Sequence, residues 1–145
     1  MYFLKFDHVD FSYYSNTGEI QVLQDMSFEI ERGSFIAVVG PSGCGKTTLM
    51  NILGGLDIPD FGGVWIRNTS LKDLSKEERT IFRRRNIGFV FQQYNLIPSL
   101  SIRENIVLPM RLDGKEIDID FFNEIVEILG LKDKLERFPS TLSGG

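Results

Sequence analysis

The stretch GPSGCGKT, from Gly40 to Thr47, has residue types and spacing suited to holding a phosphate group. It matches the pattern G-x-x-x-x-G-K-[ST], in which glycines let the backbone wrap a phosphate with its N–H groups pointing inward. Lys46 would reach the β- and γ-phosphates of a nucleotide, and the Thr47 hydroxyl would ligate Mg²⁺. We therefore predict a nucleotide-binding loop. The residues expected to contact the nucleotide are Gly40, Pro41, Ser42, Gly43, Cys44, Gly45, Lys46, Thr47 and Thr48.

Cys44 lies inside this loop and is the single cysteine of the chain. One interpretation is a redox-sensitive thiol beside the phosphate. We favour the other, a small residue at a variable position of the motif. A single cysteine excludes an internal disulfide framework and indicates a reducing compartment.

The elements around the loop follow from hydrophobic patterning. Residues 35–39, FIAVV, are apolar at every position, which predicts a strand covered on both faces before the loop. A helix should begin at about Lys46, where its N-terminus would add a positive dipole end, and stop at Gly54 and Gly55. The apolar stripe expected on this helix is formed by Leu49, Ile52, Leu53 and Leu56.

Further strands are predicted at residues 4–11, 22–30 and 64–67, and a buried one at 87–91, IGFVF. After about Gln93 the sequence becomes helical in character. Two capping boxes and one capping aspartate predict the helix starts, namely Ser75 with Glu78, Ser101 with Glu104, and Asp118. The last helix should carry Phe121, Phe122, Ile125, Ile128 and Leu129 and close at Gly130. We expect an α/β fold with a β-rich, nucleotide-binding part at 1–93 and a helical part at 94–145.

Composition limits the functions that the chain can have. Sixteen basic and twenty acidic residues give a net charge of −4, which disfavours a nucleic-acid partner. No apolar run approaches the roughly 18–20 residues that span a bilayer. Charged residues interrupt the apolar residues at the N-terminus, so this segment lacks the continuous apolar region of a secretory signal. The run Arg83–Arg85 could form a patch for phosphate or lipid headgroups, but we interpret it as the solvated, basic end of a helix.

Two further motifs identify the type of phosphate loop. GFVFQQYNLIP carries Gln92 at the end of the buried strand predicted at residues 87–91, and LSGG occupies residues 142–145. Together with the loop they resemble the nucleotide-binding domain of ABC transporters, with Walker A loop, Q-loop and signature motif in that order. The finer pattern is similar to the branch that includes lipoprotein-release, macrolide-export and bacitracin-type peptide-antibiotic transporters. The resemblance implies an ABC-type P-loop NTPase core plus an α-helical subdomain, truncated at the signature.

The resemblance also implies roles for individual residues. An aromatic residue before the loop stacks on adenine in this family, and Tyr13 is the first choice, with Tyr14 as the alternative. Gln92 would ligate Mg²⁺ and sense the γ-phosphate. The signature residues Ser143, Gly144 and Gly145 would face the ATP held by a second subunit. Residues 93–105 would face a membrane permease.

The chain lacks the motifs that carry hydrolysis in this family. We find no run of four apolar residues followed by Asp and Glu: FIAVV ends in Gly40, IGFVF ends in Gln92, and EIDIDFF alternates. His8, the only histidine, lies in the first strand and cannot act as the family's downstream switch histidine. No catalytic residue is therefore assigned. In the family the strands flanking residues 35–39 follow the signature, so we also expect an unpaired apolar edge and poor solubility.

Three functions remain open on this basis. The first is the ATP-binding subunit of an ABC transporter, using ATP and Mg²⁺, pairing head to tail with a second such subunit, and docked on a permease at the cytoplasmic face of the membrane. The second is a fragment that only binds nucleotide and is catalytically inactive. The third is a soluble ABC ATPase with no membrane partner.

Overall fold

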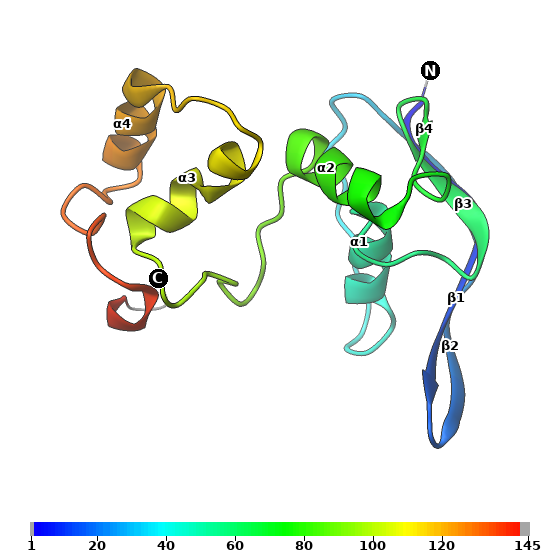
Figure 1. Cartoon of the computed structure of the whole chain (residues 1–145). Coiled ribbons are helices and arrows are strands. Elements are labelled where there is room, and N and C mark those ends of the chain that lie inside the picture. Colours follow the sequence, from blue (N-terminus) through cyan, green and yellow to red (C-terminus); the bar gives the residue numbers. More distant parts are fainter. Residues whose placement is uncertain (1, 143–145) are drawn as a thin grey trace. The chain divides into compact units, whose positions relative to one another are not determined.

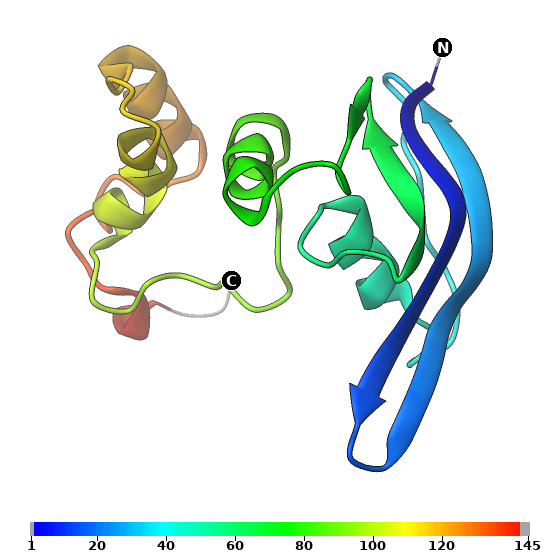
Figure 2. The ribbon, with the colours of Figure 1, turned by 45° about the vertical axis from the view of Figure 1, so that its right-hand side comes forward.

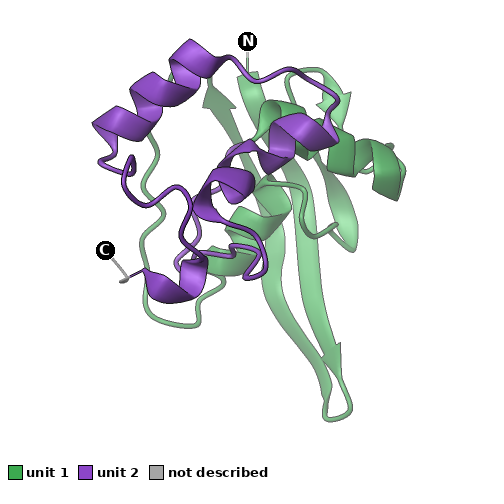
Figure 3. Cartoon of the chain, turned by 60° about the vertical axis from the view of Figure 1, so that its left-hand side comes forward, with its two compact units in different colours: residues 1–87 green, residues 88–145 purple. Residues whose placement is uncertain are grey.

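The structure is a computed structural model that describes residues 2–142. The chain forms two compact units, residues 1–87 and residues 88–145 (Figures 1 and 3), and each is described by itself. The functional boundary predicted after Gln93 differs from this division by packing and stays a prediction. Within the described residues, no helix is both long enough and apolar enough to cross a bilayer.

The first unit is built on an antiparallel sheet with the strand order β2-β1-β3-β4. The long strands β1 (Tyr2–Ser15) and β2 (Gly18–Glu31) form a hairpin, and β3 (Phe61–Ile66) pairs with β1 on its other side. A short strand β4 (Thr69–Ser70) completes the sheet. Figure 2 shows the hairpin extending well beyond the other strands. The strands expected at 4–11, 22–30 and 64–67 are thereby confirmed, with longer extents for the first two, whereas the third begins at Phe61 and ends at Ile66.

Helix α1 (Lys46–Leu53) packs against this sheet (Figure 2). Leu49 and Ile52 from its apolar stripe are buried, while Leu56 falls beyond the helix end and is 41% exposed. Gly54 caps the helix as expected. Helix α2 (Lys76–Asn86) begins with the expected capping box, in which Ser75 and Glu78 satisfy each other's backbone N–H groups. The core of the unit contains Phe6, Val9, Phe11, Leu23, Leu49, Ile52, Val64, Ile66 and Leu71.

Two predictions of buried strands are wrong. Residues 34–40 and 87–91 have no regular secondary structure, and Phe35, Val39 and Val90 are 97%, 85% and 103% exposed. Strand formation requires pairing partners, and none of the described strands pairs with either segment. The apolar composition of these segments suits buried strands, but within the described residues no strand pairs with them and several of their side chains are exposed.

The second unit contains α3 (Ile102–Leu112), α4 (Ile119–Ile128) and the short 3₁₀ helix η1 (Pro139–Thr141). The capping box of Ser101 with Glu104 is confirmed, and the Asp118 carboxylate accepts a hydrogen bond from the Phe121 N–H. A small core holds the helices together. It is formed by Ile102, Val107, Phe122, Val126 and Leu135.

Candidate functional site

Of the residues predicted to bind phosphate, 40–45 form the loop before α1, and Gly45 caps the N-terminus of that helix. Gly45 has φ 91°, in the left-handed region that favours glycine. A Cβ atom at this position would lie 2.8 Å from Cγ1 of Val22 on β2. Gly43 also has a positive φ, 80°, but a Cβ atom there would meet nothing within 4 Å. The hairpin therefore lies directly against the end of the loop at Gly45.

Lys46 folds back over the loop that precedes it. Its ammonium donates to the carbonyl oxygens of Gly40 and Pro41 at 2.9 and 2.6 Å, and its Nζ lies 3.7 Å from Sγ of Cys44. An ammonium has only three donors, so these contacts fix its position. The positive charge is consequently held at the loop backbone, where phosphate oxygens would compete with the carbonyls for the same donors.

The start of α1 provides further groups that suit an anion. Its first N–H groups have no acceptor within the helix, and its first turn carries no acidic residue. The helix dipole places partial positive charge at the same end. Thr47 is exposed there, with a hydroxyl oxygen of the hard type that Mg²⁺ prefers, whereas Thr48 is buried. Loop and helix together fit a phosphate group with a bound cation.

Tyr13 lies beside this first turn. Its hydroxyl is 3.2 Å from Oγ1 of Thr48, and its ring packs edge-on against Phe11 with 5.0 Å between centroids. Tyr14 is the next residue of β1, so its side chain leaves the opposite face of the strand. Partial desolvation and the carboxylates of Asp60 and Glu19 raise the pKa of Tyr14. Of the two tyrosines, Tyr13 is thus the one in contact with the helix that carries Thr47 and Thr48.

The other predicted site residues are not brought together with the loop by the described geometry. Gln92 belongs to the second compact unit and is exposed, whereas Thr47 belongs to the first. Shared Mg²⁺ ligation by this pair therefore stays a prediction. Ser143, Gly144 and Gly145 lie outside the described residues. In the part of the chain that the structure describes, no group of three or more His, Cys, Asp or Glu residues could hold a metal.

Some contacts near the site carry no sequence signal. Asp60 accepts a hydrogen bond from the Ser12 N–H at 2.7 Å and so anchors the strand that carries Tyr13. Arg83 lies in the basic last turn of α2, as expected, and in addition donates to the Gly55 carbonyl at 2.7 Å. Both contacts join residues more than 25 positions apart, so local patterns could not have revealed them.

His8 is exposed and has a structural partner, as expected for a residue outside the site. Its Nδ1 lies 2.6 Å from the Asp25 carboxylate, and its backbone N–H donates to the Ser27 hydroxyl. The hydrogen bond to Asp25 raises the pKa of His8. His8 and Asp25 also share a positive φ, 48° and 45°, at an irregular part of the hairpin register.

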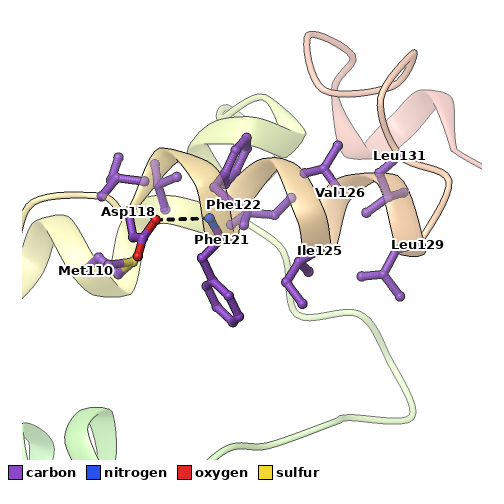
Figure 4. A pocket seen from close by; sticks show the side chains of 11 residues that line it. Met110, Asp118, Phe121, Phe122, Ile125, Val126, Leu129 and Leu131 are labelled. Atoms are coloured by element: carbon purple, nitrogen blue, oxygen red, sulfur yellow. Dashed lines mark hydrogen bonds between the residues drawn. The ribbon is translucent and has the colours of Figure 1, made fainter.

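The second unit contains a pocket of its own (Figure 4). The pocket has a volume of about 250 Å³ and is lined almost entirely by apolar side chains of α3, α4 and nearby residues. Phe121 and Ile125 of α4 and Leu129 at its C-cap are among them, and none of the three belongs to the buried core of this unit. None of the residues predicted to bind nucleotide lines it.

Comparisons with known proteins give the family. The model of the ABC transporter family matches residues 23–145. An uncharacterised ABC transporter ATP-binding protein of Methanocaldococcus jannaschii is 43% identical over 125 residues, which cover 85% of this chain and 56% of that protein. The lipoprotein-releasing system ATP-binding protein LolD of Bacteroides thetaiotaomicron is 42% identical, with 88% of this chain and 60% of LolD covered. The macrolide export ATP-binding/permease protein MacB of Bdellovibrio bacteriovorus is 40% identical over 92% of this chain and 21% of its own length.

A solved structure agrees with these relatives. A dimeric ATP-binding cassette in a post-hydrolysis state, bound to ADP and Pi, superposes with a TM-score of 0.86 at 37% identity. The match covers 97% of this chain and 63% of that one. The chain thus spans 56–63% of the length of the cassette and of the two ATP-binding proteins above. The family model, the relatives and the common fold lead to one conclusion: the chain belongs to the ABC transporter family.

Proposed function

We propose that the chain is the N-terminal part of an ATP-binding subunit of an ABC transporter and that its phosphate loop binds MgATP. The observation that carries this proposal is the arrangement at the start of α1. Lys46 is held at the loop backbone, the helix N-terminus is free of acidic residues, and Tyr13 is in contact with the same turn. A phosphate chain and an adenine ring would find complementary groups within one compact unit.

Each residue has a defined task in this proposal. The loop N–H groups and Lys46 bind the phosphates, the Thr47 hydroxyl holds Mg²⁺, and Tyr13 stacks on adenine. Bound Mg²⁺ would neutralise phosphate charge and orient the γ-phosphate. Gln92 would complete the cation site, and Ser143 to Gly145 would face the nucleotide of a second subunit. No residue of the chain is assigned to activate water, so hydrolysis is proposed only for the longer protein.

The proposed partners are a membrane permease and a second ATP-binding subunit. The printed names of two relatives, a lipoprotein-releasing system protein and an export ATP-binding/permease protein, support the first. The dimeric state of the similar cassette supports the second. The proposed location is the cytoplasmic face of the cell membrane, reached through the permease.

The experiment is a steady-state ATPase assay on the longer protein and on the 145-residue chain. Lys46→Ala in the longer protein should abolish hydrolysis, because it removes the charge held at the loop, whereas Lys132→Ala in the second unit serves as the matched lysine control. Retained activity in Lys46→Ala would mean that the loop is misassigned. The 145-residue chain should show no turnover above background, and steady hydrolysis that Lys46→Ala removes would contradict this part.

A second candidate is a polypeptide that binds nucleotide without hydrolysing it. The absence of an apolar run followed by Asp and Glu in the sequence favours it for the 145-residue chain taken alone. MgATP binding without turnover by the longer protein as well would favour this candidate over the first.

A further inference from the structure

We infer that Thr48 is a positioning residue that fixes the Tyr13 ring beside the phosphate loop, so that the platform for the base and the cradle for the phosphates form one preorganised unit. This inference rests on the proposed function, because it concerns the same nucleotide site. It assigns to the Thr48 side chain a task directed at another residue of the protein, through the hydroxyl contact of 3.2 Å between Tyr13 and Thr48.

Thr48 is a suitable anchor because it does not move freely. It lies in the first turn of α1 and is 6% exposed, between the exposed Thr47 and the buried Leu49. As a β-branched residue in a helix, it has few rotamers available. Burial together with this small choice of rotamers restricts where its hydroxyl can lie relative to the loop before α1.

Tyr13 has the exposure that a stacking platform requires. Its side chain is 46% exposed although its hydroxyl bonds inward, and one edge contact is supplied by the buried ring of Phe11. Two contacts at different parts of the ring restrict both side-chain torsions. Without the Thr48 contact, the ring would keep its edge packing against Phe11 but lose the polar contact that orients its hydroxyl.

The backbone of β1, which carries Tyr13, is also held close to the start of α1. The Ser12 N–H donates to Asp60, and Val22 of the paired strand packs against Gly45 at the start of α1. The backbone that carries Tyr13 therefore has a fixed distance to the loop, and the Thr48 contact sets the remaining freedom of the side chain. Preorganisation of this kind strengthens binding by reducing the ordering that a ligand must impose.

The test is a double-mutant cycle on ligand affinity, using Thr48→Val and Tyr13→Phe in the 145-residue chain. Each variant removes one hydroxyl and keeps the side-chain shape. The probes are ATP and inorganic tripolyphosphate, each with Mg²⁺, measured by isothermal titration calorimetry. With the contact broken, ATP binding would have to order the ring itself, so each single variant should bind ATP about threefold to tenfold more weakly.

Two further results are expected if Thr48 acts through Tyr13. The double variant should bind ATP no more weakly than the weaker single variant, because both substitutions break the same contact. Tripolyphosphate, which has no base to stack, should bind to all of these variants as it binds to the unmodified chain, because the contact expected between Thr48 and the phosphates is assigned to its backbone N–H, which Thr48→Val keeps. Thr48→Ser, which keeps a hydroxyl, should retain ATP affinity, and Tyr2→Phe controls for loss of a tyrosine hydroxyl on the same strand.

Several outcomes would overturn the inference. Additive losses in the double variant would mean that the two hydroxyls act independently. Weaker tripolyphosphate binding by Thr48→Val would mean that Thr48 serves the phosphates directly, and unchanged ATP affinity in both single variants would remove the effect itself. An unmodified chain that binds neither probe would overturn the proposed function for this chain, and the inference with it.

Discussion

Gly45→Ala probes the contact between the hairpin and the end of the phosphate loop. Two costs are expected from the structure. A residue with a Cβ in the left-handed conformation, φ 91°, costs about 1–2 kcal/mol. Placing that Cβ 2.8 Å from Cγ1 of Val22 adds an overpacking cost of about 1–3 kcal/mol. The free energy of unfolding of the first unit should therefore fall by about 2–5 kcal/mol in total.

Gly43→Ala separates these two costs. Gly43 has φ 80°, but a Cβ atom there would meet nothing within 4 Å, so only the backbone cost of about 1–2 kcal/mol applies. The difference between the two alanine variants isolates the steric contact. Val22→Ala should relieve that contact, so in the double variant with Gly45→Ala the total cost should be smaller than the sum of the single costs.

The assay is urea unfolding followed by the fluorescence of Trp65. This residue is the only tryptophan of the chain and lies in β3, so it reports on the first unit. Equal losses in Gly45→Ala and Gly43→Ala would refute the packing of the hairpin against the loop. Strict additivity of Gly45→Ala with Val22→Ala would refute the identity of the contact.

Three other predictions test separate parts of the structure. The Asp25 carboxylate raises the pKa of His8, so the pair stabilises the fold at pH values below the ordinary histidine pKa, and this contribution is lost as the pH rises through the folded-state pKa. NMR titration of His8, the only histidine, should show a pKa above the ordinary value. In Asp25→Asn this pKa should return toward the ordinary value. Ser101→Ala removes the capping hydroxyl of α3 and should lower the free energy of unfolding of the helical unit by about 0.5–2 kcal/mol, measured by circular dichroism. The exposed Ser99→Ala is the control, and an equal loss in both variants would contradict the cap. Val39→Lys places a charge in the exposed apolar segment and should reduce concentration-dependent association in light scattering, whereas unchanged association would show that another surface is responsible.

Local features of the fold could be predicted from the sequence because their causes are local. The capping box of Ser101 with Glu104 spans four residues, and its backbone N–H groups have no other acceptors nearby. The spacing of Leu49 and Ile52 likewise determines which face of α1 is buried. The start of α1 at Lys46 also follows from the loop motif.

Features that depend on distant partners could not be predicted in the same way. Residues 35–39 have the composition of a buried strand, but pairing decides whether a strand forms, and no described strand pairs with them. The contact of Tyr13 with Thr48 joins positions 35 apart. The sequence placed Phe121 in the last helix, but its surroundings could not be read from it: the residue is 60% exposed and lines the pocket. Sequence periodicity gives the apolar positions of a helix and does not say how many partners cover them.

The central claim is that residues 40–48 form a nucleotide-binding loop in this chain. The most direct measurement is calorimetric titration of the 145-residue chain with MgATP, alongside Lys46→Ala and the matched control Lys132→Ala. The structure predicts saturable binding by the unmodified chain and by Lys132→Ala, and its loss in Lys46→Ala, because the charge that Gly40 and Pro41 hold at the loop is removed. Binding that persists undiminished in Lys46→Ala would contradict the claim.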